Sequence, residues 1–172
     1  ETYAEPGGNP AALLHDRPPL VLDANVDPTG TNRRVFVMVN HTRSFIDIDQ
    51  DPGDGPRVRA KRKAQAESIA NMLQTLQTAN PTASVISVGD YNAYQFNDGY
   101  TDPVSVIKGS PTADDQMVVD QSPDLVNPNF ANLIDSVPAD SRYSFIFEGT
   151  PQALDHVFVN TVALARNTRI HI

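Results

Sequence analysis

Polar side chains of the kind that hydrolyse phosphate esters lie at the ends of three apolar segments. They are, in chain order, the pair Asn40 and His41, the pair Asp90 and Asn92, and Asp155. Strand ends can hold such side chains rigidly over a cleft. Phosphodiester hydrolysis needs a carboxylate that orients and deprotonates water, an amide or imidazole that stabilises phosphoryl charge, and usually a divalent metal. The three clusters together predict this chemistry.

Each cluster taken singly has a structural explanation. His41 can be a histidine that only hydrogen-bonds at the end of a sheet, and Asp155 can cap a neighbouring loop. Asp90 and Asn92 belong to residue types that favour turns. Gly89 allows a sharp backbone turn, after which Asp90 and Asn92, two positions apart, can point into one cleft. The prediction therefore depends on these residues meeting in space.

The remaining pattern predicts an α/β chain in which strands outnumber long helices. Strands are expected at 20–26, 35–39, 85–88, 143–147 and 156–159, and a helix at 57–78. Ile69, Leu73 and Leu76 form the apolar stripe of that helix. The strands at 35–39 and 85–88 are apolar throughout or nearly so, which favours burial on both faces. A turn is expected at 27–30, and long loops across 97–142.

Composition narrows the class of protein. The chain has 172 residues, a formal net charge of −8 and no cysteine. This length suits one domain, and the absence of cysteine excludes disulfides, thiolate metal sites and cysteine nucleophiles. No apolar run approaches the length of a membrane-spanning helix. The acidic charge argues against nucleic-acid binding through a basic coat, although local arginines can still contact phosphate.

Two further segments have more than one interpretation. Five of the thirteen basic residues fall between Arg57 and Lys63, where we expect a solvated helix start; the alternative is one wall of a nucleic-acid groove. The segment 47–51 begins like an EF-hand loop, but Pro52 and Val58 replace the required Gly and Glu. A looser calcium site in this loop remains an alternative.

In order and spacing, these motifs resemble the endonuclease/exonuclease/phosphatase superfamily, which includes DNase I, abasic-site endonucleases and neutral sphingomyelinases. The string Gly89-Asp90-Tyr91-Asn92-Ala93 carries most of the resemblance, which extends over about residues 17–160. Bacterial secreted nuclease-like members are the most similar. The resemblance implies part of a DNase I-like α/β sandwich, with two packed mixed β-sheets flanked by helices. It also implies a secreted or periplasmic nuclease that uses Mg²⁺ or Mn²⁺, with Ca²⁺ as an alternative, on a nucleic acid substrate.

The resemblance also implies roles for individual residues. His41 corresponds to a histidine that contacts the region of the scissile phosphate. Asp90 corresponds to the aspartate that orients or deprotonates water, and Asn92 to the asparagine that supports the phosphoryl oxygens. Asp155 corresponds to the aspartate that orients a catalytic histidine, and Arg17 resembles an arginine that approaches phosphate.

Other family motifs have no counterpart in the sequence. The family places an Asn motif and a metal-binding Glu upstream, and a Ser-Asp-His motif with the catalytic histidine downstream; His156 does not match that histidine. We therefore expect residues 1–172 to be one partial domain, truncated at both ends and inactive alone, with the main metal ligands outside it. The alternatives are a non-catalytic calcium-binding surface or adhesion domain on the same fold, and a lipid or sugar-phosphate phosphoesterase.

Overall fold

The computed structural model describes residues 1–27, 30 and 33–166, so the turn predicted at 27–30 lies partly outside the described residues. The strands are β1 (Thr2–Tyr3), β2 (Ala12–Leu13), β3 (Leu20–Asn25), β4 (Arg34–His41), β5 (Ser84–Asp90), β6 (Ala131–Asn132), β7 (Phe145–Phe147), β8 (Thr150–Gln152) and β9 (Asp155–Val159). The α-helices are α1 (Gly55–Ala79), α2 (Pro103–Lys108) and α3 (Thr161–Arg166), and the 3₁₀-helices are η1 (Asp114–Gln116), η2 (Leu133–Ser136) and η3 (Ala139–Ser141).

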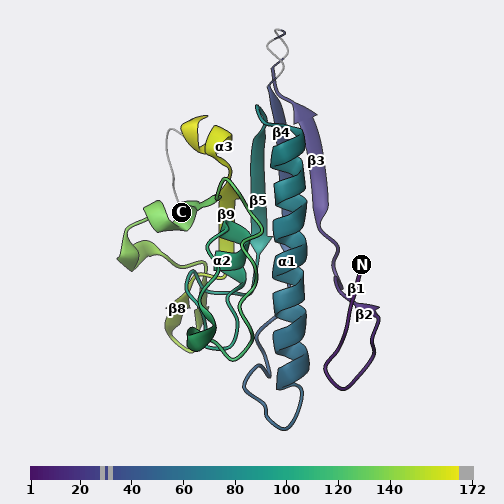
Figure 1. Cartoon of the computed structure of the whole chain (residues 1–172). Helices are drawn as coiled ribbons and strands as arrows, with labels where there is room; N and C mark the ends of the chain where they lie inside the picture. Colours follow the sequence, from purple (N-terminus) through teal and green to yellow (C-terminus); the bar gives the residue numbers. More distant parts are fainter. Residues whose placement is uncertain (28–29, 31–32, 167–172) are drawn as a thin grey trace.

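A five-stranded mixed sheet forms the centre of the molecule, in the order β3-β4-β5-β9-β6. The β4 and β5 strands pair in parallel, and the other neighbouring strands pair antiparallel. The pairs β1–β2 and β7–β8 form separate two-stranded ribbons. Figure 1 shows α1 running along one face of the sheet. The α/β fold class predicted from the sequence is confirmed.

The long helix α1 supplies most of the helical side of the core. It has a proline at its first turn, where a missing N–H costs nothing, and it ends at Ala79 before Asn80 and Pro81. Ile69 and Leu73 are fully buried, and they pack in one core with Met38 of β4 and Val85 of β5. The predicted helix and its apolar stripe are confirmed, and the predicted ends differ from the observed ones by only a few residues.

The predicted burial of the central strands on both faces is wrong. Met38 is completely buried beneath α1, whereas Val39, which points to the opposite face, is 49% exposed. Leu22 of the neighbouring strand β3 is 60% exposed on that same face, because it lies opposite Val37 in the antiparallel register. Among the described residues there is one large sheet, and α1 covers only one of its faces.

The basic segment at the start of α1 is not solvated, contrary to the expectation. Arg59, Lys61 and Arg62 are 7%, 7% and 1% exposed. Arg59 donates to the Ile48 carbonyl, and the Lys61 ammonium pairs with Asp16 at 2.8 Å. These side chains attach loops to the helix. Because they are buried in structural contacts, they do not form a basic surface.

Candidate active site

Three of the predicted residues form one row across neighbouring strands. His41 ends β4 and lies opposite Asp90 at the end of β5, and Asp90 lies opposite Asp155 at the start of β9. Directly paired residues of a sheet point to the same face. The row therefore presents its side chains on one face of the sheet, at the end where β4 and β5 finish and β9 begins. The distance from His41 Nε2 to Asp90 Oδ2 is 3.7 Å, and both side chains are partly exposed.

Asn92 is held beside this row by its own backbone. It has a φ of 46°, in the left-handed region that Asn tolerates better than most residues. Its backbone N–H donates to Asp90 Oδ1 at 2.8 Å, and its side-chain Nδ2 donates to the Thr42 carbonyl at 3.1 Å. One carboxylate oxygen of Asp90 therefore fixes the turn, while the other faces His41.

Two adjoining hollows open at this edge. The first has a volume of about 610 Å³ and is lined by Arg17, His41, Asp90 and Asn92, together with Asp16, Thr42, Arg43, Ser44 and Ile46. The second, of about 360 Å³, is lined by Asp90, Asn92 and Asp155, together with Ser44, Phe45, Ile46, Ser144, Phe145, Phe147, Gln152 and Leu154. The structure thus brings all five predicted site residues to two hollows that share Asp90 and Asn92.

A glycine is required at position 89 for a different reason from the one expected. The sequence suggested a sharp turn before Asp90, but β5 continues through both residues. Gly89 has a φ of +144°, and a Cβ atom at this position would overlap the backbone carbonyl of Asn40. The glycine therefore permits the close approach of β4 and β5, which is what places His41 beside Asp90.

Tyr91 and His156 support the site from inside the core. The Tyr91 hydroxyl contacts Ser87 Oγ at 2.6 Å and accepts from Asn40 Nδ2 at 3.0 Å. Burial raises the pKa of Tyr91, which keeps the phenol neutral. His156 is 1% exposed, with Asn132 Nδ2 2.9 Å from its Nδ1 and the Ala93 carbonyl 2.7 Å from its Nε2. Burial lowers the pKa of His156, so the ring is a neutral structural link.

Sequence reasoning missed Arg62, which positions two of the loops at the site. Its guanidinium donates to the Arg43 carbonyl at 3.0 Å and to the Asn92 carbonyl at 2.7 Å. It also pairs with Asp98 at 3.1 Å. A signal for this role was present, because Arg62 continues the buried stripe of α1 one turn before Ala66.

The sequence assigned no role to Arg43, which lies two positions after His41 of the first polar cluster, or to Ser144. Arg43 lines the first hollow, and its Nε atom is buried without a hydrogen-bond partner in the described structure. Ser144 Oγ accepts from the backbone N–H groups of Leu154 and Asp155, at 3.1 and 3.0 Å. Ser144 therefore fixes the start of β9, while Arg43 lines the same hollow as Asp90.

The described residues do not make a metal centre by themselves. Within residues 1–27, 30 and 33–166, no group of three or more His, Cys, Asp or Glu side chains could hold a metal ion. The acidic segment 47–51 lies within these residues, so it contains no such group either. Asp90 and Asp155 can each donate carboxylate oxygens, but they do not fit a complete site for a divalent cation. Across the same described residues, no helix is long and apolar enough to cross a membrane.

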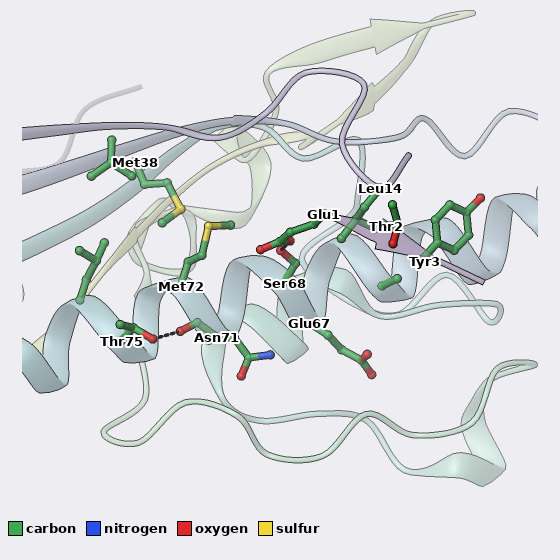
Figure 2. Close-up of a pocket in the computed structure, with 13 residues that line it drawn as sticks. Glu1, Thr2, Tyr3, Leu14, Met38, Glu67, Ser68, Asn71, Met72 and Thr75 are labelled. Carbon is green, nitrogen blue, oxygen red and sulfur yellow. Dashed lines mark hydrogen bonds between the residues drawn. The ribbon is translucent and has the colours of Figure 1, made fainter. Parts of the chain in front are cut away.

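A third hollow lies apart from the predicted site residues. It has a volume of about 620 Å³ and is lined by residues of α1, β3, β4 and the N-terminal segment. Figure 2 shows Met38 and Met72 facing each other across it, with Glu1 beside Ser68. None of the five predicted site residues lines this hollow.

Comparison with known proteins gave matches among solved structures only. No protein-family model matches the sequence, and no curated protein matches it significantly. The human Nocturnin catalytic domain with bound sulfate anion has a TM-score of 0.47 and 14% identity, over 77% of this chain and 38% of that one. Truncated Caenorhabditis elegans TDP2 has a TM-score of 0.42 and 14% identity, over 81% of this chain and 51% of that one. The chain spans about half of the length of these structures or less.

Proposed function

We propose that the sheet edge carrying His41, Asp90 and Asp155 belongs to a phosphodiesterase that acts on nucleic acid. The observation that carries the proposal is the strand register, which places an imidazole and two carboxylates in one row. An amide, Asn92, and two arginines, Arg17 and Arg43, line the adjoining hollow. These are the groups needed to activate water and to neutralise phosphoryl oxygens.

Each residue has a role that follows from its position. Asp90 accepts a proton from water or orients it, because one of its oxygens is engaged by the Asn92 backbone and the other lies 3.7 Å from His41 Nε2, in the wall of the first hollow. His41, when protonated, donates to a phosphoryl oxygen. The guanidinium groups of Arg17 and Arg43 suit the same phosphate through their planar donors. Asp155, at the start of β9, adds a second carboxylate to the row beside Asp90.

We also propose a divalent metal requirement and export from the cell, both of which rest on the sequence resemblance. Mg²⁺ or Mn²⁺ would stabilise charge on the phosphate. Because the described residues do not form a complete cation site, the roles above belong to the side chains alone. Loss of activity in EDTA, restored by Mg²⁺ but not by Ca²⁺, would support the metal proposal; activity unaffected by EDTA would oppose it.

The proposed function is tested in the natural protein that contains this chain, by hydrolysis of circular single-stranded DNA and, for comparison, by nicking of supercoiled plasmid. We expect Asp90→Asn to lower the rate by about 10²–10⁴-fold, the range typical for removal of a general base. Asp115→Asn is the matched control, since Asp115 is exposed and lines neither hollow at the sheet edge. Equal activity in the two variants would refute the assignment. His156→Ala is unsuitable as a control, because His156 is buried and hydrogen-bonded.

A further inference from the structure

Five aromatic side chains gather beside the candidate active site. We call them the aromatic row; they are Phe45, Tyr94, Phe96, Phe145 and Phe147. The rings of Tyr94 and Phe96 stack at 5.3 Å with an interplanar angle of 14°, and Phe45 lies 5.6 Å from Tyr94. Phe145 and Phe147 are two positions apart on β7, and their rings stack at 6.4 Å and 21°.

The row is open to solvent, unlike aromatic residues that stabilise a core. Phe96, Phe145 and Phe147 are 59%, 48% and 54% exposed. Single exposed apolar residues are ordinary, but contiguous exposed apolar surface marks a binding site. The rings of each pair are nearly parallel, and an exposed aromatic ring can bind another flat ring by stacking.

The aromatic row starts beside the carboxylates of Asp90 and Asp155 and continues away from them. Phe45, Phe145 and Phe147 line the hollow of about 360 Å³ that also contains Asp90 and Asp155. Tyr94 and Phe96 line a further hollow of about 230 Å³, together with Arg142. Gln152 lines both hollows, so they adjoin at the β7–β8 ribbon.

Positive charge lies at both ends of this path. Arg17 and Arg43 line the hollow on the far side of Asp90, and Arg142 lines the hollow beside Phe96. Arg142 donates to the backbone carbonyls of Val137 and Asp135, which are uncharged partners. A ligand that follows the path therefore meets a cation, a pair of carboxylates, a series of rings and another cation.

We propose that the aromatic row binds the bases of single-stranded nucleic acid, and that it selects single strands over duplex for hydrolysis at Asp90. This rests on the proposed function. In a duplex the base faces are stacked inside the helix, whereas a single strand exposes every face to aromatic side chains. The arginines at the two ends suit the phosphates that connect successive bases.

Binding is measured in EDTA by fluorescence anisotropy, with a labelled oligothymidylate of about a dozen nucleotides, on the scale of known single-strand sites. The comparison ligands are an abasic strand of equal length and the corresponding duplex. We expect the base-bearing single strand to bind about tenfold more tightly than either, the order of one stacked base. Phe147→Leu and Phe96→Leu keep an apolar side chain but remove the ring, so each should reduce this ratio severalfold.

Two variants serve as controls. Phe147→Tyr retains the ring and should retain the ratio, and Leu164→Ala removes an exposed apolar side chain on α3, outside the row. Equal binding of base-bearing and abasic strands, tighter binding of duplex, or a wild-type ratio in the leucine variants would overturn the proposal. Binding to neutral phosphatidylcholine vesicles that depends on Phe147, without base-dependent strand binding, would also overturn it and indicate a lipid surface.

The two proposals can fail separately. Hydrolysis that needs Asp90 but shows no dependence on bases would remove the single-strand inference and leave the phosphodiesterase function intact. Base-dependent binding, together with equal hydrolysis of single-stranded DNA by Asp90→Asn and Asp115→Asn, would remove the proposed function and leave a single-strand-binding surface.

Discussion

Arg62 shows how a residue outside the motifs controls the geometry of the site. Its side chain is almost completely buried. It donates hydrogen bonds to the backbone carbonyls of Arg43 and Asn92, which line the same hollow as Asp90. A buried guanidinium is tolerated because Asp98, whose side chain is 12% exposed, pairs with it. Removing one partner of such a pair leaves the other charge buried without compensation.

The prediction at this scale is that Arg62→Met lowers the free energy of unfolding by about 3–5 kcal/mol, the range for breaking a buried ion pair. Arg57→Met is the matched control on the same helix. The pair that Arg57 forms with Asp54 is 37% and 55% exposed, so we expect a loss below about 1 kcal/mol. Urea unfolding followed by circular dichroism measures both. Similar losses in the two variants would contradict the structural role of Arg62.

The central sheet has two very different faces. Asn40, Met38 and Phe36 point toward α1 and are buried, while Val39 and the leucines of β3 on the other face are about half exposed or more. The sequence of β4 is apolar on both faces, so its pattern could not show which face is covered. Only the position of α1 in the folded chain decides this.

At the scale of the sheet, we predict that the folded chain binds the hydrophobic dye ANS through this open face. The variant Leu20→Thr/Leu22→Thr should lower the dye fluorescence while changing the free energy of unfolding by less than about 1 kcal/mol, because these side chains are 69% and 60% exposed. Ile69→Thr, which lies in the core at 0% exposure, is the contrasting control and should destabilise the fold. Unchanged dye fluorescence in the double variant would show that the dye binds elsewhere.

For the whole molecule, two histidines make stability depend on pH: His156, which is buried, and His15, which is partly buried. Burial lowers the pKa of both His15 and His156 from the ordinary value of 6.5. Below that value the unfolded chain takes up protons that the folded chain does not, so acidification favours unfolding. The stability from these neutral rings is complete above about pH 6.5 and falls as the pH drops toward the lowered values.

We therefore predict a free energy of unfolding that decreases between about pH 7.5 and pH 5.5, with a slope of at most about 1.4 kcal/mol per pH unit for each histidine below pH 6.5. His156→Gln should have a lower stability but a smaller slope. Denaturant unfolding at several pH values gives both quantities, and an unchanged slope in His156→Gln would contradict the prediction.

The sequence by itself determined the local features of this protein. Periodicity predicted α1, and apolar runs predicted β3, β4, β5 and β9. This is possible because the hydrophobic pattern of a helix or strand depends on residues that are close together in the sequence. The polar clusters at strand ends and the family resemblance together singled out Arg17, His41, Asp90, Asn92 and Asp155.

The tertiary structure decided what those features do together. The parallel pairing of β4 with β5, and the antiparallel pairing of β5 with β9, place His41, Asp90 and Asp155 in one row. The same fold buries Arg62, leaves one sheet face open and exposes Phe145 and Phe147 beside the carboxylates. These outcomes depend on contacts between residues far apart in the chain, which local periodicity does not encode.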